Sequence, residues 1–470
     1  MNGARRECVV LFVLATFAAG LAAGCARWGA PRPATKFHGP LRVSPRNPRY
    51  FTDDAGKAIY LTGAHTWNNL VDMGPTDPPN AFDYPAYLDF MTRHHHNFMR
   101  LWTWELATWN TVANSQKEFH YIRPLVYRRT GPGTALDGKP KFNLNEFDPE
   151  YFDRLRSRVT AARDRGIYVS VMLFEGWGVQ RIAGGWKGHP FHRDNNVNGV
   201  NGDVDGDGNG LEIHELVNPA VTALQEACVR KVVDTVNDLD NVLYEISNEN
   251  HPPSTPWQYH IINFVHDYEK TKPKQHPVGM TFQYQGGKNS DLFASPAEWV
   301  SPNPDGGYRD DPPAADGRKV ILNDTDHLWG IGGSVGWVWK TFARGHNPIF
   351  MDPYDDKVLQ KRPKLDCEGI RRAMGQTLRL AERIALAEMA PHGELVSTKY
   401  CLANPGQEYV VYSPSSGTIT VDLTAAKGKF AIEWFNPRTG EATAADPVAG
   451  GAKRAFAPPF SGNAVLHLKR

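Results

Sequence analysis

Short apolar segments with strand-like composition alternate with segments of helical spacing through most of the chain, and this alternation limits the fold more than any other feature. A strand, a helix and a strand at this spacing predict a parallel sheet, because a crossover helix must return the chain to the same edge. Eight units of this kind predict an α/β fold of the (β/α)8 (TIM) barrel type, which we assign to residues 50–392. The expected strands are residues 58–62, 97–104, 167–173, 242–246, 277–282, 292–294, 320–324 and 348–351.

The expected helices begin and end at recognisable signals. Asp148 can cap a helix that has Pro149 in its first turn and Gly166 at its end. The helices are expected at residues 84–94, 147–166, 218–239, 257–270, 335–342 and 366–389.

The pattern changes after residue 393. Short strand-like segments at residues 408–412, 418–423, 430–435 and 464–468 follow one another with turn residues and no helical pattern between them. We therefore expect a small all-β sandwich as an accessory domain over residues 393–470.

The N-terminus has the composition of a targeting segment. Arg5 and Arg6 precede an apolar run at residues 9–23 that is short for a membrane span and ends in small residues. We expect a signal peptide at residues 1–25, a linker at 26–49, and export to the periplasm, the outer membrane or the medium. The end of the run resembles a bacterial lipobox with Cys25 as the lipidated residue, although Leu21 lies one place further from Cys25 than the Leu of the usual motif. Lipidation and plain cleavage both remain open, and a lipid would be the only membrane attachment.

Charge and cysteine content exclude several classes of protein. The 52 Lys and Arg balance 51 Asp and Glu, so no basic field favours nucleic acid as a partner. Cys228, Cys367 and Cys401 remain after the leader and allow at most one disulfide, which excludes a disulfide-stabilised scaffold. We expect a monomer.

The reactive residues gather at the ends of the expected strands, which meet at the C-terminal mouth of a barrel. Several carboxylates among many of the 13 Trp residues are typical of a carbohydrate site, because carboxylates supply acid, base or nucleophile and flat aromatic rings pack on sugars. One expected strand ends in Asn248 and Glu249. Glu249 could serve as a general acid and base, and the Asn248 amide could hydrogen-bond a substrate hydroxyl. The candidates are His65, Trp67, Arg100, Trp104, Glu175, Trp177, Asn248, Glu249, Asp324, Asp326, His327, Trp329 and Asp352.

Two of these motifs carry a resemblance to a known group. Asn97-Phe98-Met99-Arg100 and Ser247-Asn248-Glu249 resemble the strand-two and strand-four motifs of the clan A retaining glycoside hydrolases, in particular the exported cellulase-like, DUF4038 apiosidase-like group. The resemblance covers residues 42–389 and implies that Glu249 is the acid/base and that Arg100 orients the nucleophile. The C-terminal domain is similar to one labelled "putative collagen-binding domain of a collagenase", although no His-Glu-x-x-His zinc motif supports a collagenase.

The chain departs from the clan at the seventh strand. The clan has a Glu nucleophile there, whereas residues 320–327 read VILNDTDH. Asp324 and Asp326 have the same side-chain parity, and either could attack the anomeric carbon. The substitution leaves retention or inversion open, and Glu175 could replace both. The alternative to a hydrolase is a non-catalytic carbohydrate- or matrix-binding lipoprotein.

Residues 201–212 read NGDVDGDGNGLE and match the spacing of an EF-hand-type calcium loop. We expect either a structural Ca²⁺ site or a solvated acidic loop, and no cofactor for catalysis. The candidate ligands are Asn201, Asp203, Asp205, Asp207 and Glu212.

Overall fold

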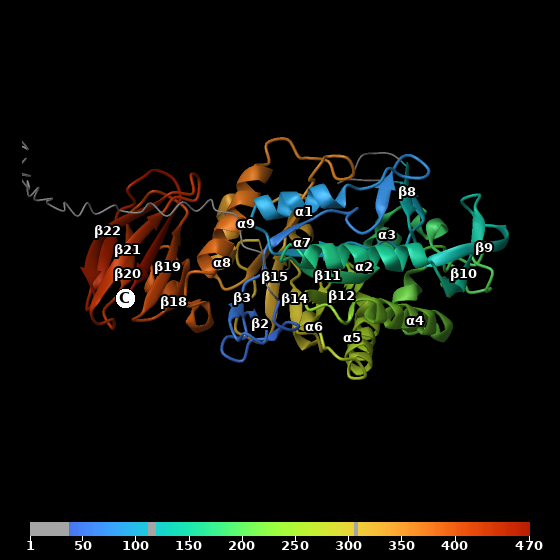
Figure 1. The fold of residues 1–470 in the computed structure, drawn as a ribbon, viewed down its shortest axis with the longest axis horizontal. Coiled ribbons are helices and arrows are strands. Elements are labelled where there is room, and N and C mark those ends of the chain that lie inside the picture. Colours follow the sequence, from blue (N-terminus) through green and yellow to red (C-terminus); the bar gives the residue numbers. More distant parts are fainter. Residues whose placement is uncertain (1–36, 111–118, 305–308) are drawn as a thin grey trace, which may run out of the picture.

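The computed structural model describes residues 37–110, 119–304 and 309–470, which form a barrel with a β domain packed against one side (Figure 1). The expected signal peptide, Cys25 and the first part of the expected linker lie outside these residues. Among the described residues, no helix is long and apolar enough to cross a membrane.

Eight parallel strands form the barrel sheet in the order β4-β16-β15-β14-β13-β12-β11-β6, which confirms the expected fold. Every residue in these strands is buried, which explains why they read as continuous apolar runs. The strands are β4 (Gly63–His65), β6 (Phe98–Leu101), β11 (Tyr168–Glu175), β12 (Val242–Asn248), β13 (Val278–Thr281), β14 (Trp299–Ser301), β15 (Val320–Asp324) and β16 (Asn347–Met351). The helices around them include α1 (Tyr84–Arg93), α2 (Pro149–Arg163), α4 (Pro219–Val236), α5 (Thr255–Glu269), α6 (Asn289–Ala294), α8 (Val335–Ala343) and α9 (Cys367–Ala381).

Asn97 closes the barrel between its first and second strands. Its side chain accepts a hydrogen bond from the Thr62 backbone N–H at 2.9 Å and donates one to the Tyr60 carbonyl at 2.8 Å. A Cβ on Gly63 would lie 1.9 Å from the Phe98 carbonyl oxygen, so only glycine permits the two backbones to come this close.

Three expected elements were misplaced. The first barrel strand is β4 rather than residues 58–62, because Ala58–Ile59 pairs as β3 in a separate antiparallel sheet. Residues 292–294 belong to helix α6, and the sixth strand is β14, where the Trp299 indole fills the space left by Gly279 on the adjacent strand. The last helix ends at Ala381, not at residue 389.

The described part of the expected linker is folded. β1 (Arg42–Val43), β2 (Phe51–Thr52) and β3 (Ala58–Ile59) form a three-stranded sheet. Leu41 and Phe51 are buried in one apolar cluster with Phe98 and Tyr168, which begin barrel strands. This sheet therefore packs against the N-terminal ends of the strands, away from the candidate active site.

Irregular insertions lie on the opposite side of the barrel. A hairpin of β9 (Tyr127–Thr134) and β10 (Pro140–Phe147) and a small sheet of β5 (Asp72–Gly74), β8 (Phe119–Arg123) and β7 (Thr108–Asn110) come from the loops that follow the first two barrel strands. The sequence pattern did not indicate either one.

The C-terminal domain is an antiparallel β structure with its own apolar core, as expected. Its larger sheet has the order β17-β18-β19-β24-β21-β22, and β20 pairs with β23. The strands are β17 (Ala390–Pro391), β18 (Cys401–Asn404), β19 (Glu408–Ser413), β20 (Ile419–Asp422), β21 (Lys429–Phe435), β22 (Ala442–Ala449), β23 (Lys453–Phe456) and β24 (Ala464–Lys469). β22 escaped detection because it is an exposed edge strand with few large apolar residues.

An apolar interface joins this domain to the barrel. Trp339 of α8 stacks on Tyr412 of β19, with ring centroids 6.2 Å apart and planes at 12°. The Trp339 ring also lies 5.7 Å from that of Phe435. Both partners belong to one buried cluster shared by α8, α9 and the sheet, so burial of apolar surface holds the two bodies together.

Cys228, Cys367 and Cys401 are buried free thiols.

Candidate active site

A pocket of about 550 Å³ opens at the C-terminal ends of the barrel strands. Carboxylates, imidazole and aromatic rings share its wall, as expected for a sugar site. The lining residues are Trp67, Trp102, Trp177, Arg181, Asn248, Glu249, Phe282, Tyr284, Pro304, Arg309, Asp326, His327, Leu328, Trp329 and Gly330.

Glu249 directly follows β12 and turns its side chain into the pocket. Its backbone has φ of 49°, in the left-handed region, and its carbonyl accepts a hydrogen bond from Gln180 Nε2 at 3.0 Å. Glu249 is only 5% exposed. Burial, followed by repulsion from Asp326 and Glu175, raises its pKa well above the ordinary value. The pKa of Glu249 is therefore displaced in the direction that a general acid needs.

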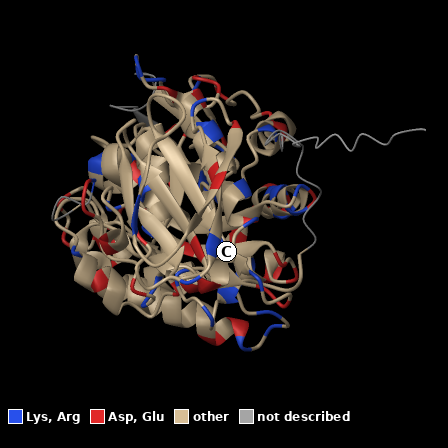
Figure 2. Cartoon of the chain, turned by 90° about the vertical axis from the view of Figure 1, so that its left-hand side faces the viewer, with Lys and Arg blue, Asp and Glu red and all other residues tan. Residues whose placement is uncertain are grey.

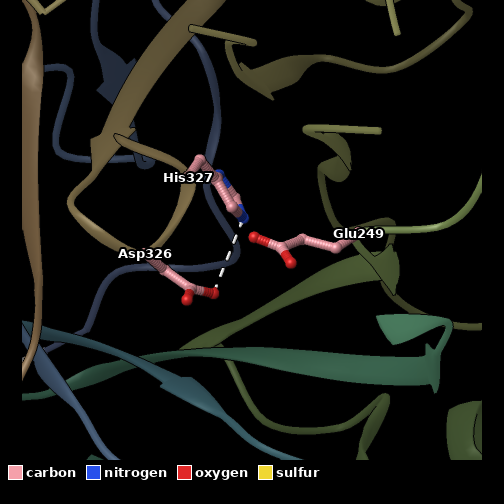
Figure 3. A group of neighbouring side chains, drawn as sticks. All are labelled: Glu249, Asp326 and His327. Atoms are coloured by element: carbon pink, nitrogen blue, oxygen red, sulfur yellow. Dashed lines mark ion pairs between the residues drawn. The ribbon is translucent and has the colours of Figure 1, made fainter. Parts of the chain in front are cut away.

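Asp326 lies opposite Glu249, at the start of the short helix α7 (Asp326–Trp329). One carboxylate oxygen of Asp326, one of Glu249 and a ring nitrogen of His327 all lie within 4.8 Å of one another (Figure 3). Burial raises the pKa of Asp326 to about 6 against the opposing effect of Arg100. Asp326 is therefore mostly ionised at pH 7, while the raised pKa of Glu249 favours its protonated form, the division of roles that acid and nucleophile require.

Asp324 has a different environment. It is absent from the pocket lining and only 1% exposed. Its carboxylate lies 2.9 Å from His65 Nε2 and 2.9 Å from Arg100 Nη1, and it accepts the backbone N–H of Asp326 at 2.9 Å. Burial alone would raise the pKa of Asp324, but His65 and Arg100 outweigh it and hold the pKa well below its usual range. The geometry makes Asp324 a support for the turn that carries Asp326.

Arg100 connects the carboxylates beneath the pocket. Its guanidinium donates to both oxygens of Glu245, at 2.9 and 2.5 Å, to Asn248 Oδ1 at 2.7 Å, and to Asp326 at 3.3 Å. Burial would lower the pKa of Arg100, but Glu245 and Asp324 raise it above its ordinary value. The arginine is therefore a permanent cation that fixes the positions of the groups around it.

The contacts of His327 define its tautomer. Burial lowers the pKa of His327 well below its ordinary value, so the ring is neutral. Nε2 faces Asn248 Oδ1 at 3.3 Å, an oxygen that already accepts from Arg100, and Nδ1 lies 2.6 Å from Ser301 Oγ. Nε2 therefore donates to Asn248, and Nδ1 accepts the serine proton. These hydrogen bonds, from Ser301 through His327 to Asn248, orient Asn248 toward the pocket.

Three of the four predicted aromatic platforms line the pocket: Trp67, Trp177 and Trp329. The rings of Trp67 and Trp177 have centroids 5.5 Å apart. Trp104 is wrong as a platform because it is fully buried, and its indole N–H donates to the Trp67 carbonyl at 2.9 Å. It packs beneath Trp67 and supports that residue.

Three other predicted contacts do not reach the pocket surface. His65 binds Asp324, as described above. Glu175 is 1% exposed and accepts the backbone N–H groups of Trp177 and Gly178, the first two residues of α3 (Trp177–Arg181), at 2.9 Å each. Burial raises the pKa of Glu175 to about 8. Asp352 is fully buried and paired with Arg371 Nε at 2.7 Å.

Sequence reasoning missed part of the pocket wall and the partner of Arg100. Glu245 is a charged residue in the middle of an otherwise apolar strand, a signal that could have indicated its buried ion pair. The missed lining residues include Arg181, whose guanidinium lies 5.0 Å from the centre of the Tyr284 ring. Arg181 ends α3 and Tyr284 follows β13, so both lie beyond the strand ends, where the strand pattern gives no register.

The expected calcium loop brings three of its carboxylates together. Asp203, Asp205 and Glu212 each offer an oxygen within 4.8 Å of the others, and Asp207 is not part of this group. Asn201 uses its side-chain amide to donate to the Asp203 carbonyl at 2.8 Å. Burial and the neighbouring aspartates raise the pKa of Glu212, a repulsion that a cation would relieve.

Comparisons with known proteins agree with this architecture. Three solved structures have a similar fold: a protein titled "Glycoside hydrolase" (TM-score 0.57, 13% identity, covering 93% of this chain and 98% of that one), a glycoside hydrolase family 5 protein from Bacteroides vulgatus (TM-score 0.57, 12% identity, 93% and 95%), and a protein from the same organism titled "putative glycoside hydrolase" (TM-score 0.58, 13% identity, 92% and 82%). At these identities the likeness establishes the fold. No curated protein sequence gives a significant match.

Two family profiles match parts of the chain. Residues 390–466 match the family described as "Putative collagen-binding domain of a collagenase", which agrees with the expected relationship of the C-terminal domain. Residues 120–285 match a domain of unknown function, DUF6298. The second match spans β11, β12 and the loops that carry Trp177 and Glu249.

Proposed function

We propose that this protein is an exported glycoside hydrolase that cleaves O-glycosidic bonds of a poly- or oligosaccharide with retention of configuration. One observation carries the proposal: Glu249 and Asp326 present carboxylate oxygens within 4.8 Å of each other across an aromatic-lined pocket. Retaining enzymes hold their two carboxyl groups about 5–5.5 Å apart, whereas inverting enzymes need about 6.5–9.5 Å to admit a water. The geometry favours a direct nucleophile over an activated water.

The proposed reaction has two displacements. Protonated Glu249 gives its proton to the glycosidic oxygen as the Asp326 carboxylate attacks the anomeric carbon, and the leaving alcohol departs. Glu249, now ionised, takes a proton from a water that attacks the glycosyl-Asp326 ester and releases the sugar with its original configuration. Asn248, oriented by Arg100 and His327, is placed to bind a sugar hydroxyl.

The test is a hydrolysis screen of the mature protein on plant and microbial polysaccharides, with Glu249→Gln as the matched variant. Reducing ends released by the wild type and not by the variant would support the hydrolase. Binding of a glycan with equal affinity by both proteins, with no product from either, would instead favour the non-catalytic carbohydrate- or matrix-binding protein.

The pH profile provides an independent prediction. We expect kcat/KM to rise with pH as Asp326 ionises near pH 6, the value to which burial raises its pKa. It should fall again at higher pH as Glu249 loses its proton, since the pKa of Glu249 is raised above that of an ordinary Glu. Initial rates on a chromogenic glycoside between pH 4 and 10 would measure both limbs. A profile that is flat through this range would contradict the assignment.

We also propose that residues 201–212 bind one structural Ca²⁺ through Asp203, Asp205 and Glu212. Saturating Ca²⁺ should raise the thermal unfolding midpoint of EDTA-treated protein, because a ligand at 100 times its Kd stabilises the folded state by about 2.7 kcal/mol. The variant Asp205→Asn/Glu212→Gln should lose this response. An equal response in the variant, or no response in the wild type, would contradict the site.

Export and anchoring rest on the leader sequence. Lipidation at Cys25 predicts that a radiolabelled fatty acid is incorporated into the wild type and not into Cys25→Ala. Secretion of a shortened, unlabelled wild type would show plain signal cleavage instead.

A further inference from the structure

A second cavity, of about 730 Å³, lies beside the active-site pocket, between the barrel and the C-terminal domain. Arg309 and Trp329 line both cavities, so the two are neighbours across a shared wall. The β domain contributes Tyr412, Pro414 and Asn463 to the far side. We call this cavity the interdomain groove.

The interdomain groove has an excess of positive charge, whereas the whole chain is almost neutral, with a formal net charge of +1. Arg309, Lys340, Arg362 and Lys364 line it, and Asp310 is the one acidic residue among its described lining residues, a balance of four positive charges to one negative. Elsewhere acidic and basic residues are interspersed, as the view from the side of the β domain shows (Figure 2). The groove is therefore more basic than the chain as a whole.

Aromatic and polar groups accompany the charge. The rings of Trp329 and Trp337 are perpendicular, with centroids 5.8 Å apart, and the Arg309 guanidinium lies 5.6 Å from the centre of the Trp329 ring. On the opposite wall Asn463 Nδ2 donates to the Tyr412 hydroxyl at 3.4 Å. Aromatic faces suit the apolar faces of sugar rings, and guanidinium and ammonium groups suit carboxylate or sulfate substituents.

Both walls of the groove are fixed. Trp337 and Lys340 are on α8, the helix whose Trp339 stacks on Tyr412 of the β domain. Because this interface is buried and apolar, the groove is already formed before a ligand arrives, which lowers the cost of binding.

We propose that the interdomain groove binds an anionic segment of the glycan whose reacting sugar occupies the active-site pocket. The substrate class is then a polysaccharide with uronate or sulfate groups near the cleaved bond, and the C-terminal domain completes the binding cleft. This inference rests on the proposed function for the reaction, but binding to the groove does not require hydrolysis.

The test measures binding by calorimetry to Glu249→Gln, so that no ligand is consumed. The probes are oligosaccharides of alginate (carboxylates), chondroitin sulfate (sulfates) and cellulose (neutral). Lys340→Glu/Lys364→Glu should weaken binding of the anionic probe about 10-fold or more while changing binding of the neutral probe little. Preference between alginate and chondroitin sulfate would identify the anion.

Lys399→Glu is the matched control, because Lys399 and Lys364 are both exposed, both have positive φ (65° and 71°), and Lys399 does not line the groove. It should leave affinity unchanged. Equal weakening by Lys399→Glu, or equally tight binding of a poly-glutamate peptide, would reduce the effect to general charge attraction and overturn the proposal. Neutral oligosaccharides hydrolysed without any binding of anionic probes would overturn the groove but keep the hydrolase, whereas anionic binding without hydrolysis in the wild type would keep the groove alone.

Discussion

Replacing Asp326 by Asn is expected to lower kcat about 10⁴-fold or more, because a neutral amide cannot form the glycosyl ester on which a retaining reaction depends. The side chain keeps its size, and Arg100 can still donate to its oxygen. The loss should therefore appear with little change in stability. Rates on an aryl glycoside and a thermal unfolding curve would measure both.

Asp324→Asn, two residues away, is the natural control. This substitution removes a charge that faces Arg100 and His65 but leaves an oxygen to accept the Asp326 N–H. We expect a smaller loss of kcat, of about 10- to 100-fold for a positioning residue, together with lower stability.

A 2-deoxy-2-fluoro glycoside that traps the intermediate would identify the nucleophile directly. The label should appear on Asp326 in the wild type and in Asp324→Asn, and peptide mass spectrometry would locate it. A label on Asp324 would reverse the assignment, and no label together with a product of opposite configuration would indicate inversion.

Arg100→Met is expected to cause the largest loss of stability of any single substitution at the site. Arg100 is 2% exposed and is the only cation among the described residues that forms an ion pair with Glu245, whose side chain is fully buried. Removing one partner of a buried ion pair costs about 3–5 kcal/mol, because the other charge is left in a medium of low polarity. Urea denaturation would measure the free energy of unfolding.

Two further variants separate charge from packing. Arg156 is 44% exposed and paired with Asp238 on the surface. Arg156→Met should cost less than about 1 kcal/mol, as is usual for exposed pairs. Arg100→Met/Glu245→Gln should recover part of the loss, since the unpaired carboxylate is gone. Equal costs for Arg100→Met and Arg156→Met would contradict the buried network.

Arg100→Met should also move the acidic limb of the pH profile. Arg100 lowers the pKa of Asp326 against the larger effect of burial. Without the cation the pKa of Asp326 rises, so the remaining activity should begin at a higher pH than in the wild type. A shift to lower pH would show that another group controls this limb.

The sequence by itself determined the barrel and the position of the proposed acid, Glu249. The eight strands are buried on both faces, and most of them leave continuous apolar runs in the sequence, although β4 and β14 were misplaced. Asn248-Glu249 at the end of one such run is placed by the strand itself. Arg100 was recognisable from its place near the end of another expected strand and from the resemblance of Asn97-Phe98-Met99-Arg100 to the strand-two motif.

The tertiary structure decided what the pattern could not. Asp324 and Asp326 have the same parity on one segment, and only the approach of His65 and Arg100 from other strands shows that Asp324 is a buried support and Asp326 faces Glu249. Trp104 and Trp177 both follow strands, yet one packs beneath Trp67 and the other lines the pocket. These assignments depend on contacts between segments far apart in the chain, which local periodicity does not encode. The interdomain groove arises in the same way, from α8 and β19 meeting across an apolar interface.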